Sequence, residues 1–181
     1  MHTDVALTKQ VAPADLVSLT RDPICHNWVM TKLVVKGVDE LKSMVGNHLG
    51  YSDYLTITQD QVNRFADATG DHQWIHIDVE RAKAGPFGGP IAHGYLTLSL
   101  GPVLLPQIFG VEGVAMGINY GTNKVRFTSP VPVGSKLRAG AKLLSVEDVS
   151  GGVQVTLETT FEVENAKKPS CVAEVVFRYY L

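Results

Sequence analysis

The chain reads, from residue 65 to residue 78, Phe65-Ala-Asp-Ala-Thr-Gly-Asp71-His-Gln-Trp-Ile-His76-Ile-Asp78. Two side chains that can exchange protons, Asp71 and His76, lie five residues apart in this stretch and follow a glycine. On a regular helix this spacing would place them roughly 140° apart, because one turn takes about 3.6 residues. They can face one target only if the backbone bends, which Gly70 permits. We therefore predict a bent loop that brings the two side chains together.

A second stretch follows a passage rich in glycine and proline. Residues 85–90 read Gly-Pro-Phe-Gly-Gly-Pro, which favours irregular backbone, and Ile-Ala-His-Gly-Tyr at 91–95 then opens a long apolar run. From Tyr95 to about Leu105 this run predicts a helix with no polar face, as expected of a helix buried under a sheet. Pro102 should end or kink that helix. The run to Val111 is about long enough to cross a bilayer, but polar residues, glycine and prolines interrupt it, so a buried helix is the better interpretation.

Upstream of the motif, apolar spacing predicts two further helices. Residues 38–49 place Val38, Leu41, Val45 and Leu49 three to four positions apart, which predicts an amphipathic helix ending at Gly50. A short strand is expected over 51–56. Thr58 with Gln61 three positions later is a capping-box pattern for a helix that carries residues 62, 65 and 66 inward.

Downstream of the motif, the pattern changes to strands. One or two helical turns are expected over 79–84, and β-forming residues dominate from Val111 onward. A sheet that follows helices in this order predicts an α+β fold, with an antiparallel sheet and helices on one face. The predicted strands cover residues 114–120, 123–127, 136–146, 152–163 and 171–180.

Composition limits the class of protein. The 181 residues are 45% hydrophobic, enough for one ordinary core, so we expect a single domain over 36–181 and an N-terminal extension of unknown role over 1–35. Sixteen basic and eighteen acidic residues without long runs argue against a nucleic-acid partner. Cys25 and Cys171 form no close pair, which favours a reducing compartment. The first twenty residues lack the apolar core of a secretory signal, so a cytoplasmic location without membrane association is expected.

The two stretches together resemble a known family. The run Phe-Ala-x-x-Thr-Gly-Asp-x-Gln-x-Ile-His-x-Asp, followed by Gly-Pro-Ile-Ala-His-Gly-Tyr-Leu, is similar to the hydratase motif of the MaoC-like (R)-specific enoyl-CoA hydratases and dehydratases. The resemblance extends from about Val38 to the C-terminus. It implies the hot-dog fold, a curled antiparallel sheet wrapped around one long central helix, and a homodimer. It also implies reversible addition of water to trans-2-enoyl-CoA thioesters in fatty-acid metabolism, giving (R)-3-hydroxyacyl-CoA, with coenzyme A present only as part of the substrate.

The chemistry of that reaction suits the residues of the motif. A carboxylate and an imidazole that share one water can activate it and move protons, which is the role expected of Asp71 and His76. The backbone N–H of Gly94, at the presumed start of the central helix, can stabilise the charge that develops on the thioester oxygen. The resemblance implies the same three catalytic positions. The sequence leaves open which member of the pair is the base, because coupled groups share their titration.

Other interpretations of these residues remain open. Asp71 after a glycine could cap a turn, and His76 between two isoleucines could be a core histidine. His72, His76, Asp71 and Asp78 invite a metal interpretation, but the loop lacks the glutamate of a zincin motif, so no metal is expected.

Four residues of the motif are expected to contact substrate, namely Gln73, Trp74, His93 and Tyr95. Alternatives stay open for three of them: Gln73 could orient its neighbours, Trp74 could fill the core, and His93 could support the loop through its ring or be structural. Gln73 and Trp74 stand where the family more often has asparagine and proline. Lys124 and Arg126 share one face of a predicted strand and could meet the phosphates of coenzyme A, although solvated surface charge is the better explanation of the two. Three alternative functions remain: a 3-hydroxyacyl dehydratase acting on acyl-carrier-protein thioesters, a thioesterase, and a non-catalytic module that binds acyl thioesters.

Overall fold

The computed structural model describes residues 32–181. They form one compact unit, Lys32–Leu181, whereas most of the expected N-terminal extension, including Cys25, lies outside the described residues. Leu33–Val35, which the sequence analysis placed in the extension, form strand β1. This strand pairs in parallel with β4, Phe109–Val111, so these three residues belong to the described unit.

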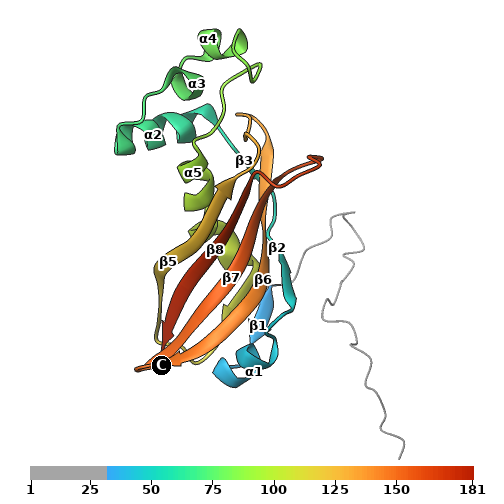
Figure 1. The fold of residues 1–181 in the computed structure, drawn as a ribbon, viewed down its shortest axis with the longest axis vertical. Helices are drawn as coiled ribbons and strands as arrows, with labels where there is room; N and C mark the ends of the chain where they lie inside the picture. The colour runs from blue at the N-terminus through green and yellow to red at the C-terminus, as the bar shows by residue number, and fades with distance from the viewer. Residues whose placement is uncertain (1–31) are drawn as a thin grey trace, which may run out of the picture. The chain divides into compact units, whose positions relative to one another are not determined.

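An antiparallel sheet is the largest element of the fold (Figure 1). Its strand order is β2-β6-β7-β8-β5, and the short β3 also pairs with β6. Neighbouring long strands follow one another along the chain from β6 to β8, which fits the predicted antiparallel sheet. The strands are β2 His48–Tyr51, β3 Leu55–Thr56, β5 Met116–Phe127, β6 Lys136–Val149, β7 Gly152–Val163 and β8 Cys171–Tyr180.

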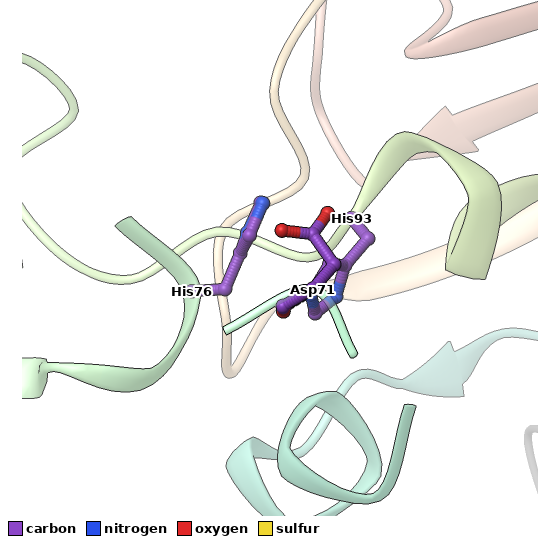
Figure 2. Close-up of side chains that lie close together, drawn as sticks. All are labelled: Asp71, His76 and His93. Carbon is purple, nitrogen blue, oxygen red and sulfur yellow. Dashed lines mark hydrogen bonds between the residues drawn. The ribbon is translucent and has the colours of Figure 1, made fainter. Parts of the chain in front are cut away.

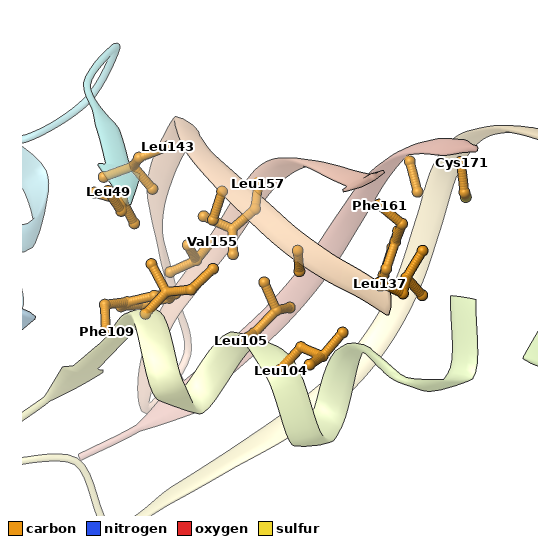
Figure 3. Close-up of a cluster of buried hydrophobic side chains, with 14 of the residues drawn as sticks. Leu49, Leu104, Leu105, Phe109, Leu137, Leu143, Val155, Leu157, Phe161 and Cys171 are labelled. Carbon is orange, nitrogen blue, oxygen red and sulfur yellow. The ribbon is translucent and has the colours of Figure 1, made fainter. Parts of the chain in front are cut away.

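The main core lies between the concave face of the sheet and one helix, α6, Gly101–Ile108 (Figure 3). Apolar residues alternate along β6 and β7, so that every second side chain points at the helix. Leu104 and Leu105 of α6 meet them there. Burial of this many aliphatic side chains is the main stabilising contribution to the fold. The fully buried large side chains of the sheet include Leu137, Leu143, Val153, Val155, Leu157 and Phe161.

The predicted central helix forms as two consecutive helices. α5, Gly94–Ser99, ends at Leu100, and α6 begins with Pro102 in its first turn, where a missing N–H costs nothing. The expected break near Pro102 is confirmed. The expectation of burial on all sides is wrong, because Tyr95 is 69% exposed and Val103 is 51% exposed. One side of this helix pair faces away from the sheet.

Local signals in the first half of the chain had mixed outcomes. The capping box is present: the Thr58 side chain accepts from the Gln61 N–H, and α2 runs from Gln59 to Thr69. The predicted helix over 38–49 is wrong beyond α1, Val38–Ser43, because Gly46 takes a φ of 90° and the chain then enters β2. Leu49 is buried, but it lies on strand β2 and not on a helix. The strand expected over 51–56 is divided between β2 and β3, and the two strands expected over 114–127 form the single strand β5.

This arrangement, an antiparallel sheet curled over helices packed on one face, is the α+β hot-dog fold that the resemblance implied. Among the helices of residues 32–181, none has the length and apolar character needed to cross a bilayer.

Candidate active site

The loop that carries Asp71 begins where α2 ends. Gly70 closes that helix in the left-handed conformation, with φ of 78°, and its N–H donates to the Ala66 carbonyl. Glycine adopts this conformation at little cost, unlike other residues. The turn sends the chain away from the helix axis, and Asp71 follows with an exposed side chain. The predicted bend at Gly70 is confirmed.

His76 lies on a short helical turn, α3, Trp74–Ile77, so the segment after Asp71 is not loop throughout. His76 is 7% exposed, and its Nδ1 lies 2.7 Å from the Ile91 carbonyl oxygen. Because a carbonyl can only accept, Nδ1 carries the proton and Nε2 has a free lone pair. The Gln59 side-chain amide donates to the His76 main-chain carbonyl at 2.8 Å, which ties α3 to the start of α2.

The surroundings of His76 lower its pKa from the ordinary value of 6.5. Burial is the largest cause, since it disfavours the charged ring, and the neighbouring His93 acts in the same direction. The Ile91 carbonyl and the Asp71 carboxylate oppose this shift. At neutral pH the ring is therefore predominantly uncharged and able to accept a proton at Nε2.

Asp71, His76 and His93 come together although they are separated in sequence (Figure 2). One ring nitrogen of each histidine and one carboxylate oxygen lie within 4.8 Å of one another. Within residues 32–181, Asp71 and His76 make no direct side-chain hydrogen bond. Atoms at such separations can share one water molecule placed about 2.8 Å from each, an ordinary hydrogen-bond length. The arrangement can thus hold and polarise a water.

The structure changes the set of residues relevant to the metal interpretation. His72 Nε2 pairs with the Asp67 carboxylate at 3.0 Å on the surface, and Asp78 caps α4, Val79–Lys83, by accepting from the Arg81 N–H. His93 takes their place beside Asp71 and His76. The expectation that the protein uses no metal stays a prediction.

Gly94 and His76 line the same cavity of about 260 Å³. Gly94 is the first residue of α5, where backbone N–H groups have no partner within the helix. The Phe127 ring packs directly on its Cα, so that a Cβ at this position would lie 2.8 Å from the ring. The remaining lining residues include Phe87, Thr97, Thr128, Ser129, Val131 and Ser170.

The four predicted substrate contacts lie around this cavity and do not line it. Gln73 precedes α3, and Trp74 packs against Gly85 and beneath the Arg81 guanidinium, 4.4 Å from its ring centroid. His93 is buried at the N-cap of α5. Tyr95 points outward and meets the Phe127 ring edge-on, with centroids 5.5 Å apart. Their contact with substrate stays a prediction.

Lys124 and Arg126 project from exposed β5. The Lys124 ammonium pairs with Glu174 on the adjacent strand at 3.0 Å, and the Arg126 guanidinium donates to the neighbouring Val125 carbonyl. Both observations fit solvated surface charge.

Sequence reasoning did not identify several residues that shape the site. Phe87 lies within the Gly/Pro passage and Phe127 ends a strand, and neither is marked by spacing or motif.

A second cavity, about 270 Å³, lies along α5, α6 and β5, and a third of about 230 Å³ shares residues 101, 102, 105 and 177 with it. Both are mainly apolar, with Leu98, Pro102, Leu105, Phe161 and Phe177 among the residues that line the second.

Comparisons with known proteins agree with the fold. Residues 40–165 match the MaoC-like domain family. The chain is 58% identical over 145 residues to the 3-hydroxyacyl-thioester dehydratase Z of Mycobacterium tuberculosis, covering 80% of this chain and 96% of that protein. It is 43% identical over 141 residues to nodulation protein N of Rhizobium leguminosarum bv. viciae, covering 74% and 85%.

A solved structure of an (R)-hydratase from A. caviae, involved in PHA biosynthesis, superposes with a TM-score of 0.61 at 26% identity, over 74% of this chain and 94% of that one. A monoamine oxidase regulatory protein from Archaeoglobus fulgius shares the fold with a TM-score of 0.64 at 23% identity, over 84% and 99%. The family match, the close relatives and the fold lead to one conclusion: the chain belongs to the MaoC-like dehydratase family.

Proposed function

We propose that this protein is an (R)-specific enoyl-CoA hydratase, which adds water reversibly to trans-2-enoyl-CoA thioesters to give (R)-3-hydroxyacyl-CoA in fatty-acid metabolism. One observation supports this most directly. A ring nitrogen of His76 and the Asp71 carboxylate lie within 4.8 Å of each other, the Ile91 carbonyl leaves the His76 Nε2 free to accept a proton, and His76 lines a cavity together with the first residue of α5. Hydration requires these three groups on one substrate.

In the proposed reaction His76 moves the proton. Neutral Nε2 accepts a proton from the water as its oxygen bonds to the β-carbon, and the electron pair of the double bond shifts onto the thioester oxygen. The resulting imidazolium returns that proton to the α-carbon as the enolate collapses. Asp71 accepts the second hydrogen bond of the water and stabilises the imidazolium. Dehydration is the same sequence in reverse.

Gly94 is proposed to stabilise the enolate through its backbone N–H. Such a donor is worth about 3–4 kcal/mol where charge develops in a transition state. The cavity that contains Gly94 has room for the thioester, while the apolar cavities along α6 suit an acyl chain. Because α5 continues into α6, a chain that extends from Gly94 along the helix pair would reach Leu98 and Leu105.

The direction of the reaction in the cell belongs to the same proposal. The mycobacterial relative is called a dehydratase of 3-hydroxyacyl thioesters, a name that specifies neither coenzyme A nor a carrier protein. A 3-hydroxyacyl-acyl-carrier-protein dehydratase is therefore the second candidate. The two differ in the carrier of the thioester and share the chemistry of Asp71, His76 and Gly94.

A homodimer is also proposed. Edge strand β5 is exposed along most of its length, and apolar Met116, Tyr120 and Phe127 face solvent there, next to exposed Tyr95 and Val103 of α5 and α6. A long unpaired edge with apolar neighbours is unusual in a lone domain. A second copy of the chain offers the same edge and the same apolar side chains.

A cytoplasmic location remains a prediction.

The experiment that tests the function follows the absorbance of the conjugated thioester after purified protein meets crotonyl-CoA or a medium-chain trans-2-enoyl-CoA. We expect loss of absorbance without thiol release, and (R)-3-hydroxyacyl-CoA as product. Asp71→Asn and His76→Ala should each reduce kcat by about 10²- to 10⁴-fold. Asp67→Asn is the matched control, because among residues 32–181 this exposed carboxylate pairs only with His72, and it should retain full activity.

Each other outcome points to a different function. Thiol release would indicate a thioesterase. Turnover of the acyl-carrier-protein ester alone would favour the second candidate, and binding without turnover of either ester would indicate a non-catalytic module.

A further inference from the structure

His93 is a buried residue that contacts several parts of the candidate site. It is 2% exposed, occupies the N-cap position of α5 and is joined by its own peptide bond to Gly94. Its Nε2 lies 3.0 Å from the main-chain carbonyl oxygen of Asp71. Since the carbonyl can only accept, Nε2 donates, and it holds the backbone of Asp71 against the start of α5.

The same ring also restrains His76. The two imidazoles stack with centroids 3.8 Å apart and an interplanar angle of 28°, and Phe65 packs against His93 from α2, with ring centroids 5.0 Å apart. His76 is therefore restrained in its plane by the Ile91 carbonyl and on its face by His93.

The loop has few other restraints at Asp71. Within residues 32–181, Asp71 makes a single hydrogen bond, the one that its main-chain carbonyl accepts from His93. Its side chain is exposed. A loop residue with an exposed side chain and a single anchor moves readily when that anchor is lost. Misplacement of a reacting group by about 1 Å can cost on the order of 10²-fold in rate.

We infer that His93 is a positioning residue, which sets the distance between Asp71 and His76 by donating a hydrogen bond to the Asp71 backbone and stacking on the His76 ring. It acts through these two residues. The inference rests on the proposed hydration for its kinetic readout only, because the anchoring of the loop is measurable without turnover.

Two variants separate the donor from the ring. His93→Gln places an amide N–H near the position of Nε2 but removes the aromatic ring, whereas His93→Phe keeps a ring beside His76 and Phe65 but removes the donor. Hydrogen exchange of the peptide that covers residues 70–77 reports the anchoring of the loop directly. Far-UV circular dichroism and the melting temperature report whether each variant is folded.

We expect faster exchange over residues 70–77 in His93→Phe, with the strands β6 to β8 unchanged, and exchange close to wild type in His93→Gln. The kcat of His93→Phe should fall by roughly 10- to 100-fold with little change in KM, because the position of the reacting groups is lost rather than the substrate site. His93→Gln should recover much of that kcat.

Two results would overturn the inference. One is wild-type exchange over residues 70–77 in folded His93→Phe. The other is an equal loss in both variants, with faster exchange throughout the sheet, which would identify His93 as an ordinary core residue. If the wild-type protein hydrates no enoyl thioester, the proposed function fails, and the exchange measurement still decides the role of His93.

Discussion

At the scale of single residues, the hydrogen bond from His76 Nδ1 to Ile91 fixes which nitrogen is available for chemistry. Because the neutral ring is the active form in either direction, activity should be lost as the pH falls through the pKa of His76. Burial lowers that pKa below 6.5, so the acidic limb of kcat/KM should have its midpoint below pH 6.5. A pH profile measured on saturating and subsaturating enoyl-CoA would check this. A midpoint clearly above 6.5 would contradict the role of His76 as base.

Gly94 allows a second prediction at this scale. A methyl group at this position would lie 2.8 Å from the Phe127 ring, closer than any stable contact, so Gly94→Ala must displace either the ring or the start of α5. We expect kcat to fall by about 10²- to 10³-fold, as for loss of one enolate donor. Phe127→Ala in the Gly94→Ala background provides space for the methyl group. Recovery of kcat in that double variant would show that the ring contact caused the loss, and no recovery would show that α5 itself had shifted.

At the scale of elements, the turn between α2 and the catalytic loop depends on a glycine conformation. Gly70 has a φ of 78° and no atom within 4 Å of a built Cβ, so Gly70→Ala introduces backbone strain without a clash. We expect unfolding free energy to fall by about 1 kcal/mol, measured by denaturant titration. Gly89→Ala is the control, because Gly89 is equally open and has ordinary φ. It should be neutral or slightly stabilising, and equal losses at both sites would refute the argument.

The elements that the sequence predicted well are those with a local cause. The Thr58 capping box, the bend at Gly70, the break near Pro102 and the long strands β7 and β8 each follow from residues that are neighbours in the chain. The helix expected over 38–49 failed because Leu49 has helical spacing from Val45 by coincidence, and pairing of β2 with β6 determines its conformation. Periodicity cannot detect a partner strand about ninety residues away.

The candidate site was predictable only in part. Asp71, His76 and Gly94 follow from the motif, whereas the part played by Phe127 depends on where the end of β5 meets the start of α5. The anchoring of Asp71 by His93 depends on a contact across 22 residues. Such contacts are products of the tertiary fold and leave no periodic signal in the sequence.

At the scale of the whole molecule, the exposed edge predicts assembly. If a second copy covers β5 and α6, the mass in solution should be twice the 19.6 kDa of one chain, as light scattering after size exclusion would measure. Val103→Lys and Met116→Lys place charges on this apolar surface and should yield monomers. Val34→Lys is the matched control, because Val34 on β1 is 50% exposed, close to the 53% of Met116, but lies outside that surface. A monomeric wild type would contradict the dimer.

The contact between Gly94 and Phe127 also constrains how sequences of this kind can diverge. The ring occupies the space of any side chain at position 94, so a larger residue there is compatible with the present backbone only when position 127 becomes smaller. Across homologous chains the two positions should covary, with glycine accompanying an aromatic residue. A library randomised at both positions and selected for folded, soluble protein should return the same pairing. Position 94, which is proposed to contribute only a backbone N–H, would thus be constrained in evolution by the side chain at position 127, 33 positions later in the chain.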